Sequence, residues 1–210
     1  MNKKGFTLIE FIVIISIFSI MASVALFNFN GFRSNIALGN LANDIGLTIR
    51  QAQVFGWANQ SGTSTSGIVL KGNDPLSGNP VRFSDGVYFT LDNPKEIVLY
   101  KKNTTLTPPY FDNVTDRVVD TVRVSGPNSI SGIYAATKKA DLLIDSDGLG
   151  GTSLNNISIA FSRPKPEALF YVSGQPLAVG DYVGIYIKAD TDTDDKHVII
   201  ISRTGEIDVQ

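Results

Sequence analysis

The chain has 210 residues with 18 basic and 20 acidic side chains, so its formal net charge is −2. That length suffices for one domain with its own hydrophobic core. The mildly acidic balance, with no cluster of Lys or Arg beyond pairs, argues against nucleic-acid binding through a broad basic face. With no cysteine and a single histidine, the chain has neither disulfides nor a zinc site of the usual nitrogen and sulfur kind.

The N-terminus has a short basic leader that ends in Gly5, followed by an apolar run over residues 6–27. A helix of these 22 residues spans roughly 33 Å, enough to cross the hydrocarbon core of a bilayer. The basic leader would stay in the cytoplasm, so the rest of the chain would be exported. One charge, Glu10, lies inside the run. A carboxylate within a membrane span costs about 2.5–3.5 kcal/mol, which favours a functional reason for its presence.

Two ordinary explanations of this N-terminus fit less well. A cleaved secretory signal has an apolar region of about 7–15 residues that ends in small residues before the cut. Here the small residue precedes the apolar run, and no A-x-A pattern follows it. A plain N-terminal anchor explains the apolar run but neither the Gly5-Phe6 pair nor Glu10.

The stretch Lys3-Lys4-Gly5-Phe6-Thr7-Leu8-Ile9-Glu10 resembles the processing motif of the type IV pilin and type II secretion pseudopilin superfamily. The resemblance implies that a prepilin peptidase cuts after Gly5 and methylates the new amino terminus on Phe6. It also implies that Glu10 guides docking of the subunit into a growing filament. The implied partners are other pilin or pseudopilin subunits, the peptidase, the assembly platform in the membrane and membrane lipid.

The same resemblance implies a place in the cell. The precursor would sit in the cytoplasmic membrane as a single-pass protein, with its N-terminus cytoplasmic and its C-terminal domain exported. It would then pass into a cell-surface pilus or a periplasmic pseudopilus. One departure is visible, because Phe27 stands where many relatives carry a proline. Whether the helix bends near residues 28–31 is therefore open.

Helical spacing continues beyond the apolar run. Apolar residues recur at steps of three and four, as one helix face requires, at Leu38, Leu41, Ile45, Ile49 and Ala52. We therefore predict a single helix from about residue 6 to about residue 57. Its first part, residues 6–27, would be the transmembrane or filament-core segment, and residues 28–58 would be an amphipathic continuation. Gly31, Gly39, Gly46 and Gly56 each cost about 1 kcal/mol in a helix, and they indicate either gentle kinks or close packing.

After a Ser/Thr/Gly linker, short β-rich runs alternate with turn residues from Gly67 onward. We predict a hairpin turn at Ser84-Asp85-Gly86, and stiff connectors at residues 107–109 and 163–166. The apolar run at residues 198–201 indicates a central strand buried under the helix. The predicted strands are residues 68–70, 81–83, 87–89, 96–100, 118–124, 133–136, 142–144, 156–162, 183–187, 198–201 and 206–209.

These elements predict an α+β fold, with a long N-terminal helix packed on an antiparallel β-sheet or β-sandwich domain. Residues 1–5 would be the leader and residues 67–210 the exported β-rich domain. The exported part resembles the H-type minor pseudopilins and fimbrial-T-like minor pilins. This likeness rests on the order of helix and β-sandwich and on the ending Ile201-Ser202-Arg203-Thr204-Gly205-Glu206-Ile207.

Catalytic motifs are missing from the sequence. His197 opens an apolar strand, and its position favours a strand-edge or hydrogen-bonded histidine over a catalytic one. No G-x-S-x-G elbow and no Gly-rich phosphate loop with Lys-Ser/Thr occurs. We therefore expect a protein that is not an enzyme and needs no cofactor.

Two acidic loops leave calcium open. The first includes Asp141, Asp145 and Asp147, but the twelfth position of a calcium loop counted from Asp145 is Asn156 rather than an acid. The second loop carries four further aspartates. Each loop is either a solvated turn or a loose calcium site, and the candidate ligands are Asp145, Asp147, Asp190, Asp192 and Asp194, with Asp195 beside them.

Two functions compete on this sequence. One is a structural filament subunit, a pilin or pseudopilin. The other is a minor tip pilin that uses the same export signal and acts as an adhesin or as a DNA- or substrate-binding module. The acidic net charge argues against the DNA-binding form of the second function.

Overall fold

A computed structural model describes residues 5–58, 84–102, 109–114, 116–124, 126, 128–143, 151–162, 165–178, 180–189 and 196–210, with the backbone alone at residues 25, 27–35, 58, 84, 162, 165 and 166. The predicted strands at residues 68–70 and 81–83 lie outside these ranges. The chain divides into two compact units, Met1–Ala37 and Leu38–Gln210.

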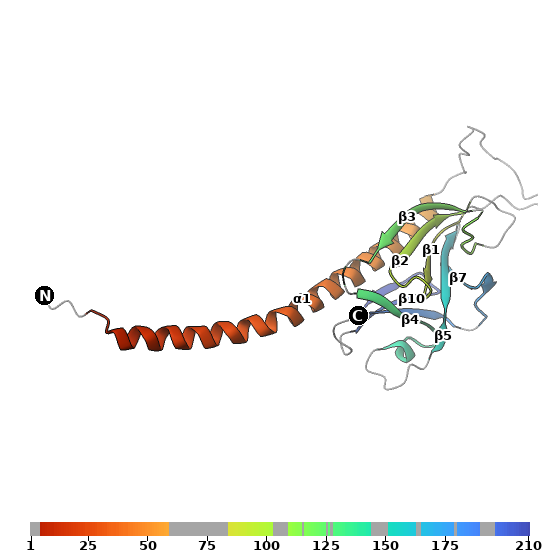
Figure 1. Cartoon of the computed structure of the whole chain (residues 1–210). Coiled ribbons are helices and arrows are strands. Elements are labelled where there is room, and N and C mark those ends of the chain that lie inside the picture. Colours follow the sequence, from red (N-terminus) through yellow and green to blue (C-terminus); the bar gives the residue numbers. More distant parts are fainter. Residues whose placement is uncertain are drawn as a thin grey trace, which may run out of the picture. The chain divides into compact units, whose positions relative to one another are not determined.

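The helix α1 covers Leu8–Ala58, 51 residues in all (Figure 1). The prediction of one long helix is confirmed. Residues 28–31 are helical like their neighbours. A proline at position 27 would remove one helical hydrogen bond and crowd the preceding turn, and Phe27 avoids both effects. Among the described residues, no helix is both long enough and apolar enough to cross a membrane.

The strands of the second unit form two antiparallel sheets (Figure 1). The six-stranded sheet has the order β3-β2-β1-β6-β7-β8, made of Arg117–Arg123, Glu96–Lys101, Ser84–Thr90, Asn156–Ser162, Lys165–Val172 and Gln175–Pro176. The five-stranded sheet has the order β11-β10-β9-β4-β5, made of Ile207–Val209, Lys196–Ser202, Tyr182–Ala189, Asn128–Ala136 and Thr152–Leu154. A 3-10 helix, η1, covers Lys139–Leu142. The fold is α+β, as predicted.

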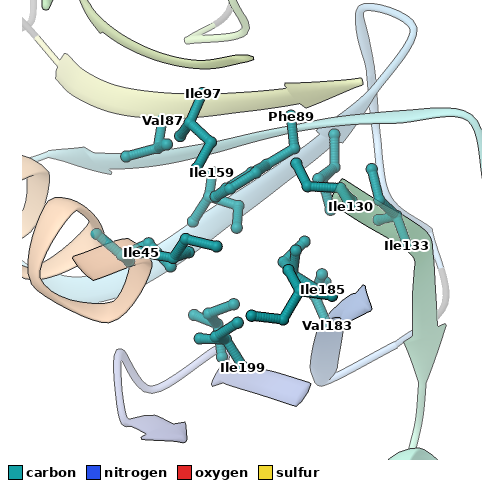
Figure 2. Close-up of a cluster of buried hydrophobic side chains, with 14 of the residues drawn as sticks. Ile45, Val87, Phe89, Ile97, Ile130, Ile133, Ile159, Val183, Ile185 and Ile199 are labelled. Atoms are coloured by element: carbon teal, nitrogen blue, oxygen red, sulfur yellow. The ribbon is translucent and has the colours of Figure 1, made fainter. Parts of the chain in front are cut away.

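The main core lies between the two sheets and the C-terminal part of α1. Ile45 of α1, Ile159 of β6 and Ile199 of β10 approach one another there, each fully buried (Figure 2). All five helix positions predicted to share one face are buried. Along the strands of both sheets, successive side chains point alternately into the core and away from it. The inward-pointing side chains of the two sheets therefore meet in one layer. The arrangement confirms that this part of the helix packs against a β-sandwich.

A second, smaller core lies on the other face of the five-stranded sheet. Val198 and Ile200 of β10 pack there with Leu142 of η1, while their neighbours Ile199 and Ile201 face the main core. This explains why residues 198–201 are apolar on both faces. β10 lies between β9 and β11, and its Ile199 and Ile201 are buried in the core with α1, as predicted, although the middle strand of the sheet is β9.

The predicted turn at Ser84-Asp85-Gly86 is wrong. These residues begin β1, which pairs with β2 on one side and β6 on the other. A Cβ atom on Gly86 would lie 2.6 Å from the Tyr100 hydroxyl oxygen and 2.6 Å from the Ile159 carbonyl oxygen. Position 86 therefore requires glycine because the strand packs closely under an aromatic ring. In the sequence, a glycine required by such packing looks the same as one required by a tight turn.

Two further predictions fail in the second half of the chain. Residues 142–144 do not begin a strand, because Leu142 ends η1, where its carbonyl accepts a hydrogen bond from the Tyr186 hydroxyl; Ile144 is outside the described residues. The connector predicted at residues 163–166 is shorter than expected, because Lys165 and Pro166 begin β7. A register shift next to Lys165 marks a bulge, where a strand tolerates proline.

Close packing against β6 explains why α1 has a glycine at position 56. A Cβ atom there would lie 2.5 Å from the Phe161 carbonyl oxygen, whereas a Cβ on Gly39 would meet nothing within 4 Å. Gly46 is intermediate, with the Val209 side chain 3.2 Å from such an atom. The glycines of α1 thus do not share one role.

Candidate functional site

The first residues of the described chain form the junction that the sequence predicts to be cut. Residues 5–7 are not helical, and α1 begins only at Leu8. Gly5 is exposed and has open space where a side chain would be, and the Phe6 side chain is 76% exposed. An exposed peptide bond outside regular structure is one that a peptidase can reach.

Thr7 and Glu10 cap the start of α1 reciprocally. The Glu10 backbone N–H donates to Thr7 Oγ1 at 3.3 Å, and the Thr7 backbone N–H donates to Glu10 Oε2 at 3.4 Å. The Thr7 hydroxyl donates to the same carboxylate oxygen at 3.4 Å. This is a capping box, in which two backbone donors without helical partners are satisfied. The negative carboxylate also lies at the positive end of the helix dipole.

The role of Thr7 was missed at the sequence level, although its signal is present. The pattern Thr7-Leu8-Ile9-Glu10 at the edge of an apolar run is the S/T-x-x-E pattern of a capping box. The resemblance to the processing motif predicted only a docking role for Glu10. The structure adds that its carboxylate is held in place by its own chain before any partner arrives.

Large apolar side chains cover all sides of α1 after the cap. Leu8 is 78% exposed and Ile14 is 49% exposed. The exposed apolar residues of this segment are Leu8, Ile9, Phe11, Ile12, Val13, Ile14, Ile15, Ile17, Phe18, Ile20, Met21, Val24 and Leu26. A surface of this kind is far more apolar than that of an ordinary soluble monomer, and such surfaces mark a protein or membrane contact.

The five candidate calcium ligands lie outside the part of the chain that the structure describes. They are Asp145, Asp147 and the aspartates at positions 190, 192 and 194, whereas Asp141 lies in η1. In the part of the chain that the structure describes, no group of three or more acidic or histidine side chains could hold a metal ion.

His197 is hydrogen-bonded, as expected. Its Nδ1 lies 3.0 Å from the Gln210 carbonyl oxygen, close to the bonds that join β10 to the C-terminus. When Nδ1 carries its proton it donates to that carbonyl. The contact gives the single histidine a structural role at a strand end.

Comparison with known proteins identifies the N-terminus alone. A family model described as the prokaryotic N-terminal methylation motif matches residues 1–26. No curated protein and no solved structure matches the chain. The matched residues include the junction at Gly5 and Phe6 and the capping box that holds Glu10. The motif indicates a membrane-anchored precursor of the pilin and pseudopilin type, which is processed by a prepilin peptidase and assembles with other such subunits.

Proposed function

We propose that the chain is a structural subunit, a pilin or pseudopilin, of a type IV pilus-like or type II secretion filament. It is cut after Gly5, N-methylated on Phe6, and assembled through its N-terminal helix. The observation that carries this proposal is that the methylation motif covers a helix segment with an exposed apolar surface. An assembling subunit needs such a surface for contact with lipid and then with neighbouring subunits.

Residues 6–27 serve as the anchor before assembly. The run has 22 residues with one charge near its start. Lys3 and Lys4 hold the leader on the cytoplasmic side, so residues 28–58 and the β-rich domain at residues 67–210 are exported. We further propose that the exported domain is of the H-type or fimbrial-T-like minor kind, and its combination of a packed helix with a β-sandwich supports this.

Glu10 directs docking by its charge. After cleavage the amino group of Phe6 lies four residues before Glu10, just outside the first turn of α1. In a bundle of such helices, the Phe6 amine of one subunit reaches the Glu10 carboxylate of its neighbour. Opposite charges about 4 Å apart attract by about 4 kcal/mol at an effective dielectric of about 20, before desolvation is subtracted. The contact forms only in register, so it selects correct docking.

The capping box makes this docking testable, because Glu10 has two separable roles. Glutamine keeps the capping interaction but removes the charge, since Gln serves at this position of a capping box. Thr7→Ala removes the hydroxyl that receives the Glu10 N–H and keeps the charge. The two variants therefore separate the effect of the Glu10 charge on assembly from the effect of the cap. The measurement is the amount of each variant in filaments sheared from cells, relative to the amount in the membrane.

We expect Glu10→Gln and Glu10→Ala to enter filaments poorly, and Thr7→Ala to enter them nearly as wild type does. All three should remain in the membrane and lose the leader. If Glu10→Gln enters filaments normally while Thr7→Ala does not, Glu10 acts as a cap only. Equal incorporation of wild type and Glu10→Ala would contradict the docking role altogether.

A further inference from the structure

An aromatic cluster lies on the outer face of the six-stranded sheet, opposite the core. Val87 and Phe89 of β1 face the core, so Tyr88 between them faces outward. The Phe111 ring packs on it with ring centroids 5.0 Å apart, and on Tyr100 at 5.2 Å. The neighbouring Tyr110 packs against Tyr171 of β7 at 6.4 Å. Residues 109–114 thus lie across the sheet face with their aromatic side chains fixed on it.

Hydrogen bonds from the sheet hold residues 109–114 in one position. The Tyr100 hydroxyl donates to the Pro109 carbonyl at 2.7 Å, and the Phe111 N–H donates to Ser158 Oγ at 3.0 Å. Burial raises the pKa of Tyr100 far above its usual value, so its hydroxyl remains a donor at any ordinary pH. Contacts from β2 and β6 therefore anchor the segment independently of its own turn.

A buried ion pair adds a third anchor. Lys102 Nζ donates to Asp116 Oδ2 at 2.9 Å and to the Tyr110 carbonyl at 2.8 Å, and the Asp112 N–H donates to the same Asp116 oxygen at 2.8 Å. The two charged side chains are 2% and 0% exposed. Burying a charge pair carries a large desolvation cost unless its hydrogen bonds are well made. Here those bonds fix the backbone of Tyr110 and Asp112.

The segment and β1 line an open surface cavity of about 490 Å³. This volume lies within the range of sites for small ligands. Its lining combines aromatic rings with two polar side chains: Tyr88, Tyr110, Phe111, Asp112 and Asn113. Because the walls are already fixed, a ligand would lose little free energy in ordering them.

The lining selects among ligand classes. The described residues of the lining include no cation, so they offer no charge partner to a phosphate or carboxylate. The Lys102 ammonium lies 5.0 Å from the Tyr110 ring centroid and already makes the cation–π contact, which disfavours a second cation on that ring. A sugar ring matches what remains. It has an apolar face of C–H groups for aromatic rings and hydroxyl groups for a carboxylate and an amide.

We propose that this cavity binds a neutral hexose unit of a saccharide, with Tyr88 and Phe111 against the ring and Asp112 and Asn113 receiving its hydroxyls. The Asp112 carboxylate already accepts the Val114 N–H at 3.0 Å, which fixes its orientation. This binding would make the exported domain a recognition module as well as a structural one. The inference is independent of filament assembly, because no residue of the first unit takes part.

The test uses the full chain purified in a detergent without a sugar headgroup. Glucose, galactose, mannose and N-acetylglucosamine are offered singly at millimolar concentration, and binding is read by saturation-transfer NMR. Tetramethylammonium and inorganic phosphate serve as probes of the two rejected classes. The variants are Asn113→Ala and Tyr88→Leu. Tyr182→Leu, on the five-stranded sheet, is the matched control.

We expect transfer to at least one sugar, weakened at least about tenfold in both cavity variants, a loss of about 1.4 kcal/mol, and unchanged in Tyr182→Leu. Asn113 is exposed, so its variant tests binding without threatening the fold. The proposal is overturned if no sugar shows transfer, if the control loses binding as much as the cavity variants do, or if tetramethylammonium or phosphate binds in place of the sugars.

Discussion

The two parts of α1 have the same backbone conformation and opposite surfaces. In residues 8–26 apolar side chains are exposed on every side, as with Leu8 and Ile14. In residues 38–52 the apolar side chains other than the exposed Leu47 lie on one face and are buried, as with Leu38 and Ile45. The second part has its partner in its own chain. The first part needs a partner that the described chain does not supply, which lipid or neighbouring subunits would provide.

This difference follows from the sequence pattern. A helix with apolar residues on one face needs one sheet to cover it, and the β-sandwich does so. A helix that is apolar all round needs an apolar environment on every side. The methylation motif lies on the second kind of helix segment, so processing and assembly concern the part that the fold leaves uncovered.

The largest expected effect comes from shortening a buried side chain. Ile45→Ala should lower the free energy of unfolding of the β-rich unit by about 2–5 kcal/mol, because it leaves a cavity between helix and sheets. Ile14→Ala removes the same atoms from an exposed position and should leave that free energy unchanged. Denaturant unfolding of the two variants, followed by Trp57 fluorescence, measures the difference. Equal destabilisation by both would remove the distinction between the two helix parts.

A smaller effect separates two glycines of the same helix. Gly56→Ala should destabilise by about 1–3 kcal/mol, because the new methyl group would collide with the Phe161 carbonyl of β6. Gly39→Ala meets open space and should stabilise by about 1 kcal/mol through helix propensity. Thermal melting gives both signs. Stabilisation by Gly56→Ala would mean that the helix does not press against β6 there.

The smallest effect is electrostatic and depends on pH. The hydrogen bond from Lys139, 3.0 Å away, holds the pKa of Asp208 below its usual value, and Asp208 in turn raises the pKa of Lys139. The pair therefore stabilises the fold above the unfolded carboxyl pKa of about 3.9. That stability is lost as the pH falls through the lowered pKa of Asp208, or rises through the raised pKa of Lys139.

Asp208→Asn should accordingly lower the melting temperature slightly at neutral pH and have no effect in strong acid. Glu206→Gln makes the same change of charge at 3.8 Å from Lys139 on a more exposed side chain, so it serves as the control with a weaker effect. A deficit in Asp208→Asn that persists unchanged in strong acid would show that the ion pair is not its cause.

Periodic segments were predictable, and positions set by distant contacts were not. The buried face of α1 and the strand at residues 156–162 follow from spacing alone. Gly86 could not be assigned, because its reason is the Tyr100 ring from another strand. β5 and β8 are too short to carry a pattern, with 3 and 2 residues. At the candidate site, the motif predicted Gly5, Phe6 and Glu10, while the capping role of Thr7 required the local geometry.

The most direct test of the central claim is the mass of the mature N-terminus. The full-length precursor is expressed in a host with a prepilin peptidase, extracted from the membrane and measured intact, beside Gly5→Trp. We predict a wild-type chain that begins at Phe6 with one added methyl group, and a variant that keeps all five leader residues and no methyl group. A wild-type chain that begins at Met1, or one cut near residue 28, would contradict the claim that α1 is the N-terminal helix of a processed filament subunit.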